Sequence, residues 1–344
     1  MALQASGQIK YSEIIAEFGT PNSGGIGEYR ISENVGSLSN LPLDTGVPQS
    51  GQIKFSDFYS KKLNHVVDLH SIGNNTSRQN AKDRWNNGNV HIVGSTKTGK
   101  TQPPDTIDDR VIINVNATIS SVKGTQTHCA LRTGNWDTNT TLEIEIGTSG
   151  KLYGSGGDGG SGGSANETAG TNGQTGSSAL GIQYPCTVNN LGVIQSGYGG
   201  GGGGGGNTRT TGGGKKSGAT TNGSSGGGGG GGAGLPAGAA GGVQTPLAVG
   251  GGTAGSAGAA GSLSNLVSGA GTGGAGGTEA GNGGNASAVN NSATKADDGT
   301  SPSGAAGGGT GGNNGYAIIT NQGSAPSVTG NSATGRIITS TNPT

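Results

Sequence analysis

Apolar and polar residues alternate in the middle of the chain. Within residues 110–122 the apolar side chains recur at every second position, and residues 142–146 repeat the pattern. A period of two residues predicts strands with one buried face. Shorter apolar runs predict further strands at 90–93, 127–132, 316–320 and 336–339.

A different pattern opens the chain, where one short sequence occurs twice. Residues 6–13 read SGQIKYSE and residues 50–57 read SGQIKFSD. Each copy predicts an extended piece followed by a helical turn, with Ser12 or Ser56 as N-cap. The first helix is expected to end at Gly19. Residues 21–48 between the copies read mostly as turns and linker.

The N-terminal region is too small to bury a core by itself. It nevertheless holds all three phenylalanines of the protein. We therefore expect its apolar and aromatic side chains to dock onto a partner. The candidates are Ile9, Tyr11, Phe18, Ile53, Phe55, Phe58 and Tyr59.

Glycine dominates the second half of the chain. Residues 154–315 contain 60 of the 79 glycines, including unbroken runs at 199–206 and 226–232. Glycine has no side chain to bury, so an ordered tract needs a core made of backbone. Polyproline II helices turn once every three residues and leave their N–H and C=O groups free for neighbouring segments. The Gly-Gly-X runs at 156–164 suit such a bundle.

A flexible Gly/Ser linker is the alternative for this tract. Apolar patches at 180–193, 247–249 and 263–267 argue against a linker, which does not need them. The predicted fold class is mainly β with little helix. It comprises a small attachment module (1–64), a β-sheet or sandwich region (65–153), a glycine-rich polyproline-II-type (polyglycine II) bundle (154–315) and a C-terminal strand pair (316–344).

Composition excludes several classes of protein. Lys plus Arg and Asp plus Glu each total 19, so the net charge of zero gives no electrostatic case for binding nucleic acid or an anionic membrane. We find no signal peptide and no apolar run that could cross a bilayer. Cys129 and Cys186 give no disulfide framework, and buried free thiols are favoured over a pair.

Motifs for chemistry fail when their context is considered. Residues 94–101 (GSTKTGKT) fit the phosphate-binding loop pattern, but Pro103 and Pro104 prevent the helix that must follow it. Asn135, Asp137 and Asn139 have calcium-loop spacing without the required glycine and final acid. The four histidines are dispersed. We predict no catalytic residue, cofactor or metal, and no enzyme activity.

The second half of the chain resembles tail-fibre and tail-tip proteins of tailed bacteriophages. The resemblance lies in the glycine tract, in the related units at 150–157 and 190–200 that introduce it, and in the Tyr-Ala-Ile-Ile segment at 316–319 that closes it. The bundle is similar to that of fibre-tip adhesins of T-even-like phages. The N-terminal repeat resembles the opening of many phage virion structural proteins, including those of cyanophages. The adhesins display aromatic-rich loops, whereas the loops here hold Tyr198 and mostly small polar residues.

This resemblance implies a virion protein assembled in the host cytoplasm and located in the tail. Residues 1–64 would dock on other phage tail or baseplate proteins, and loops between glycine runs would bind a host-cell receptor, either protein or glycan. Fibre proteins are commonly homotrimers. We expect a trimer, because the N-terminal module is too small to stand alone. A monomer is the alternative, because a glycine bundle can also form within one chain.

Charged and hydrogen-bonding side chains are scarce in the glycine tract and cluster in its loops, which makes them receptor-binding candidates. They are Asn166, Glu167, Asn207, Arg209, Lys215, Lys216, Asn290, Lys295, Asp297 and Asp298. Taken singly, each is also explained as a solvated turn residue. The rival functions are a structural virion component without a receptor and, more remotely, an ice-binding protein. Antifreeze proteins of snow fleas use the same glycine architecture.

Overall fold

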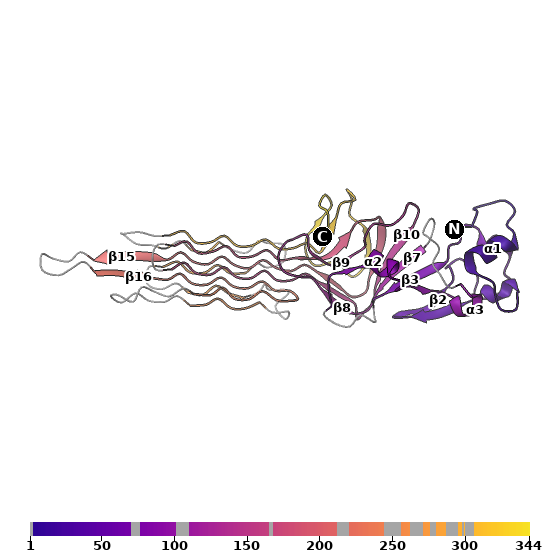
Figure 1. Ribbon diagram of the computed structural model, residues 1–344, viewed down its shortest axis with the longest axis horizontal. Coiled ribbons are helices and arrows are strands. Elements are labelled where there is room, and N and C mark those ends of the chain that lie inside the picture. Colours follow the sequence, from indigo (N-terminus) through magenta and orange to yellow (C-terminus); the bar gives the residue numbers. More distant parts are fainter. Residues whose placement is uncertain are drawn as a thin grey trace.

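The computed structural model is an elongated molecule made mostly of strands and extended segments. It describes residues 3–69, 76–100, 110–164, 168–211, 220–243, 256–261, 271–275, 280–286, 295–297, 299 and 306–344. The N-terminal module lies at one end, parallel strands form the middle, and the glycine segments run to the other end (Figure 1). The described helices are short. They are α1 (Tyr11–Phe18), η1 (Ile26–Tyr29), η2 (Phe55–Phe58), α2 (Ala81–Asn86) and α3 (Ser95–Thr98).

Three sheets form the middle of the molecule, and we call this unit the β-coil. The first has the order β18 (Ser327–Gly330), β13 (Cys186–Asn190), β10 (Thr141–Ile146), β7 (Arg110–Val115), β3 (Asn64–Asp68), β6 (His91–Ile92). The second has the order β14 (Val193–Gln195), β11 (Lys151–Tyr153), β8 (Thr118–Ser120), β4 (Thr76–Ser77). The third has the order β19 (Ile337–Ile338), β17 (Ile318–Thr320), β12 (Ser178–Ile182), β9 (Cys129–Arg132), β5 (Gln79–Asn80).

Neighbouring strands in these sheets are parallel, except that β3 and β6 are antiparallel. The order shows how the chain winds. Four turns each add one strand to the first sheet, then one to the second and one to the third, as β7, β8 and β9 do before β10, β11 and β12. The last turn adds β18 and β19 and meets the second sheet only through a bridge between Gln195 and Thr334. The chain therefore forms a three-faced coil.

Stacked aliphatic side chains fill the interior of the β-coil. Val67, Ile113, Ile144 and Val188 occupy matching positions on four successive strands of the first sheet, and all belong to one buried cluster. Leu131, Leu180 and Ile318 form the corresponding ladder in the third sheet. Burying one such side chain stabilises the fold by roughly 1.5–3 kcal/mol, so these ladders hold the coil together.

The expected small sheet or sandwich is therefore wrong in its arrangement, although the β class is right. The predicted strand at 110–122 is two strands, β7 and β8, which lie in different sheets. Val115, Ala117 and Ile119 are all buried as the chain rounds the corner between them. Every second residue continues to point inward around the corner. The alternating pattern therefore cannot show where β7 ends and β8 begins.

The β-coil also continues beyond the expected boundary at residue 153. β12, β13 and β14 come from within the region assigned to the glycine tract, and β17, β18 and β19 complete the sheets. The strands at 316–344 are thus part of the coil and not a separate pair. The similar sequences at 150–157 and 190–200 lie side by side, since β11 and β14 pair in register.

The glycine segments leave the β-coil at one corner, after β11 and again after β14, and return to it as β12 and β17. Backbone hydrogen bonds join them at every third residue. The N–H groups of Gly200, Gly203 and Gly206 donate to the carbonyl oxygens of Gln174, Thr171 and Thr168. This spacing matches a backbone that turns once in three residues.

The unbroken glycine runs are the innermost segments. Run 226–232 exchanges backbone hydrogen bonds with six others, which are 154–163, 199–206, 238–242, 256–261, 271–275 and 280–286. A run enclosed on all sides has no outward position for a side chain. Asp158 and Ser161, the X residues of an outer Gly-Gly-X run, are partly exposed.

The N-terminal module shares its core with the β-coil. Phe18, Tyr29 and Phe58 are fully buried and pack against Val66 of β3 and Ile112 of β7. Between the repeats lie η1 and an antiparallel hairpin, β1 (Ser32–Val35) and β2 (Leu38–Pro42), where mostly linker was expected.

The expected N-caps of the module are wrong. The capping positions are Lys10 and Lys54, two residues before Ser12 and Ser56. The acid three residues after each lysine accepts the lysine N–H and fixes the helix start. The predicted stop of α1 at Gly19 is confirmed.

Candidate functional site

The distal end of the glycine segments, farthest from the N-terminal module, is the first candidate site. Asn166, Glu167, Lys215, Lys216, Asn290 and Asp298 fall outside the described residues. Asn207, Arg209, Lys295 and Asp297 are placed.

A two-stranded hairpin, β15 (Asn207–Thr211) and β16 (Thr220–Ser224), projects from this end (Figure 1). Arg209 lies on β15 opposite Asn222 of β16. Asn207 is only 2% exposed, and its Oδ1 accepts the N–H of Ser224 at 3.0 Å. Asn207 thus closes the base of the hairpin and is not available to a receptor in this arrangement.

Lys295 and Asp297 lie together on an outer segment, and both are exposed. The Asp297 carboxylate accepts a hydrogen bond from the Asn282 side chain at 3.0 Å, while its carbonyl accepts the N–H of Gly205. Asp297 therefore forms hydrogen bonds to two neighbouring segments, and its charged side chain is still exposed to solvent. These groups can offer hydrogen bonds and charge to a ligand.

The predicted docking residues of the N-terminal module divide into two sets. Ile9, Phe18 and Phe58 are buried in the core. Tyr11, Ile53 and Tyr59 are partly exposed, and the Phe55 side chain is 43% exposed. The core residues hold the module together, so only the second set is available to a partner without rearrangement.

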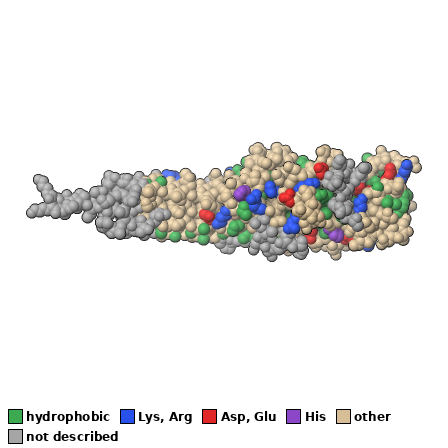
Figure 2. Space-filling model, viewed as in Figure 1, with side chains coloured by type: hydrophobic (Ala, Val, Ile, Leu, Met, Phe, Trp, Pro, Cys, Tyr) green, Lys and Arg blue, Asp and Glu red, His purple; other side chains and the backbone are tan. Residues whose placement is uncertain are grey.

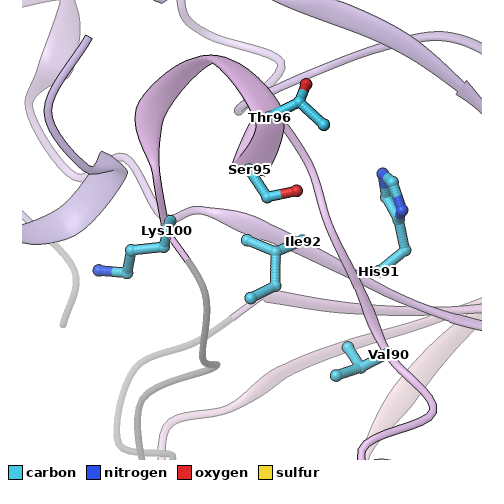
Figure 3. Close-up of a pocket in the computed structure, with 6 residues that line it drawn as sticks. All are labelled: Val90, His91, Ile92, Ser95, Thr96 and Lys100. Carbon is cyan, nitrogen blue, oxygen red and sulfur yellow. The ribbon is translucent and has the colours of Figure 1, made fainter. Parts of the chain in front are cut away.

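A cavity of about 310 Å³ lies beside the segment with the phosphate-loop pattern and is lined by Val90, His91, Ile92, Ser95, Thr96 and Lys100 (Figure 3). The pattern forms a single helical turn, α3, between Gly94 and Gly99, which both have positive φ. The Gly94 N–H donates a hydrogen bond to one carboxylate oxygen of Glu33 at 2.9 Å, and the other oxygen of Glu33 lies 2.8 Å from His91 Nε2.

Lys100, the lysine of that pattern, has a structural role. Its ammonium donates to the carbonyl oxygens of Ala16 and Glu17 at 2.7 and 2.9 Å, at the end of α1. Its side chain points away from His91 (Figure 3). The Glu33 carboxylate would repel a phosphate at this turn, and Lys100 is not available to bind one. The segment therefore does not favour phosphate binding.

Both cysteines are free thiols. Burial raises the pKa of Cys129 and of Cys186 to about 12, which disfavours the reactive thiolate. The part of the chain that is described contains no group of His, Cys, Asp or Glu suited to a metal ion. Nor do its helices include one with the length and hydropathy to cross a membrane.

Sequence reasoning missed a contact that joins the glycine segments to the β-coil. Lys123, on the connection between β8 and β9, lies 2.5 Å from the Asp158 carboxylate, which also accepts the N–H of Ala239. Asp158 is the only acidic X residue of its Gly-Gly-X run. That isolated charge was the available signal, but nothing in the sequence identified its partner.

The chain matches no family model and no curated protein. Among solved structures, it is similar to a chain in the crystal structure of the gp37–gp38 adhesin tip complex of the bacteriophage S16 long tail fibre. The match has a TM-score of 0.33 and 19% identity, and covers 98% of this chain and 99% of that one. At these values the similarity establishes neither a common fold nor a common function.

Proposed function

We propose that this protein is the tip of a bacteriophage tail fibre, attached to the virion through its N-terminal module and to the host cell through the distal end of its glycine segments. The observation that carries the proposal is the placement of the glycine tract. Two insertions leave the same corner of the β-coil, and their described segments run side by side to the end of the molecule opposite the N-terminal module.

We further propose that the glycine segments are polyglycine II helices packed as one bundle. Hydrogen bonds at every third residue and two enclosed all-glycine runs support this assignment. Such a bundle needs no side-chain core, so its connecting turns are free to vary. A stiff support with variable turns suits recognition of different surfaces.

Cell binding tests the proposal. We would label the full chain and incubate it with a panel of bacterial strains, including cyanobacteria. A variant with β15 and β16 shortened to the pair Asn207 and Ser224 serves as comparison. We expect binding to a narrow set of strains, reduced at least tenfold in the variant, with an unchanged unfolding temperature.

Equal binding by the full chain and the shortened variant would show that the hairpin does not take part in receptor binding. Binding to no strain, together with retention in purified phage particles, would favour a structural virion component. The proposal assigns no enzyme activity and no cofactor. Cys129 is buried and Cys186 is partly buried, and the lysine of the phosphate-loop pattern donates to backbone carbonyl oxygens.

A further inference from the structure

The two copies of the N-terminal repeat begin their helices in the same way, although the first continues as an α-helix and the second as a short 3-10 helix. Lys10 and Lys54 are both extended N-caps. Their N–H groups donate to the carboxylates of Glu13 and Asp57 at 2.6 and 2.7 Å. Three residues before each lysine stands a glycine with positive φ, 95° at the first copy and 74° at the second.

The copies meet through equivalent residues. Tyr11 and Phe55, which occupy the same position of the repeat, contact edge to face with ring centroids 6.4 Å apart. A contact between equivalent residues is what a local two-fold axis produces. Three residues further on, Ile14 and Phe58 are both fully buried and fix each copy to the core.

The outer side of this pair carries a matched set of exposed groups. Lys10 and Lys54 are exposed, as are the glutamines and serines two residues to either side of each, Gln8, Ser12, Gln52 and Ser56. Each lysine is followed in the sequence by one of the two contacting aromatic residues, Tyr11, which is partly exposed, and Phe55, which is 43% exposed. Figure 2 shows hydrophobic, basic and acidic side chains at this end of the molecule. We call Lys10, Tyr11, Lys54 and Phe55 the paired surface.

The acidic and basic side chains of the N-terminal module differ in whether they have partners. Its acids accept hydrogen bonds from the chain itself, as Glu17 does from the N–H of Leu63 and Glu28 from that of Ser23. Asp44 likewise accepts from Gly46 and Lys62. Within the described residues, the ammonium groups of Lys10 and Lys54 have no acidic partner. The paired surface thus presents two lysines that have no acidic partner in the described part of the chain, next to two aromatic rings in contact.

We propose that the paired surface binds an acidic protein surface that presents two equivalent copies of one site, as neighbouring subunits of a symmetric homo-oligomer do. A carboxylate of each subunit would meet one lysine, and apolar side chains between them would cover Tyr11 and Phe55. A second copy of this chain does not fit, because its paired surface would bring lysines against lysines. The inference rests on the proposed attachment of the module to a virion and specifies the partner.

The test uses phage particles produced without this protein as the probe and measures binding of the added full chain by co-sedimentation. The variants are Lys10→Glu, Lys54→Glu and the double substitution. Lys151→Glu, an exposed lysine on β11, is the matched control. We expect each single variant to weaken binding about tenfold and the double variant about a hundredfold, because separated sites add. The control should bind normally, and all variants should keep the unfolding temperature of the parent.

Failure of the unsubstituted chain to bind the particles would overturn both virion attachment and this inference. Normal binding by the double variant would overturn the inference alone and leave attachment standing. A loss confined to one lysine would contradict the two equivalent sites. Stronger binding at low salt for the parent, and a flatter salt dependence for the double variant, would support the charge pairing.

Discussion

Single glycines decide whether the bundle can pack. A Cβ at Gly203 would overlap the carbonyl oxygen of Ser161 on the adjoining segment, and that backbone cannot yield without breaking its own hydrogen bonds. We therefore expect Gly203→Ala to lower the free energy of unfolding by about 2 kcal/mol or more. The measurement is the midpoint of thermal or chemical unfolding.

Gly242 provides the control at the residue scale. It lies in the same set of segments, but it is exposed, and a Cβ there would meet only the Ser161 hydroxyl, at 3.9 Å. Gly242→Ala should leave stability unchanged or slightly raise it, because alanine restricts the unfolded chain. Equal effects of the two substitutions would mean that the bundle does not depend on close backbone contact.

One histidine should make stability depend on pH. His65 lies in the first turn of the β-coil against Trp85, and burial lowers its pKa from 6.5 to about 4. The charge of Lys100 acts in the same direction. The carbonyls of Leu63 and Arg110 favour the charged ring, yet neither ring nitrogen has a hydrogen bond of normal geometry.

Because the folded pKa is the lower one, the unfolded chain takes up the proton first. The stability due to neutral His65 is complete above pH 6.5 and falls as the pH drops toward 4. The total loss is about 3 kcal/mol. Denaturant unfolding between pH 7 and 4 should show this loss in the parent and not in His65→Leu. Parallel curves for the two proteins would contradict the prediction.

At the scale of elements, the glycine segments should be removable while the β-coil remains. Their ends meet at the coil surface. The Ser155 N–H donates to Ser177 Oγ at 2.7 Å, and the Gly315 N–H donates to the carbonyl oxygen of Gly197. Short loops can therefore replace residues 156–176 and 198–314. We expect the excised protein to keep its strand signal by circular dichroism and to unfold cooperatively.

Truncation after Tyr153 should give the opposite result. It removes β12, β13, β14 and every later strand, so the third sheet keeps only β9 and β5 of those described. Apolar ladders would then be exposed, and we expect aggregation. A folded truncated protein would show that the coil does not need the strands that follow the tract.

The sequence predicts local structure here far better than it predicts connection. The alternation at 110–122 correctly marked Ile113, Val115 and Ile119 as buried, but Asn114 on the opposite face is fully buried as well. The likeness of 150–157 to 190–200 correctly indicated, in both, a strand that runs into glycine repeats. Neither could reveal that the strands are parallel or that they coil, because these features depend on partners many residues away. The seven docking candidates illustrate the same limit: composition identified an aromatic module, but only packing separates buried Phe18 from exposed Phe55.

At the scale of the whole molecule, the structure removes the reason for expecting a trimer. The N-terminal module was thought too small to stand alone, but Val66, Ile92 and Ile112 of the β-coil complete its core within one chain. The enclosed run 226–232 likewise finds its six neighbours in its own chain. Neither unit needs a second copy in order to bury its core or pair its backbone.

We therefore expect the isolated protein to be a monomer of 33.0 kDa. Sedimentation equilibrium over a wide range of protein concentration measures this mass directly. A mass three times larger that persists on dilution would restore the trimer, and it would require an interface outside the contacts described above. A monomer that sediments more slowly than a sphere of its mass would agree with the elongated form in Figure 1. One such chain would then bring a single paired surface to its partner at one end and a single distal hairpin to the cell at the other.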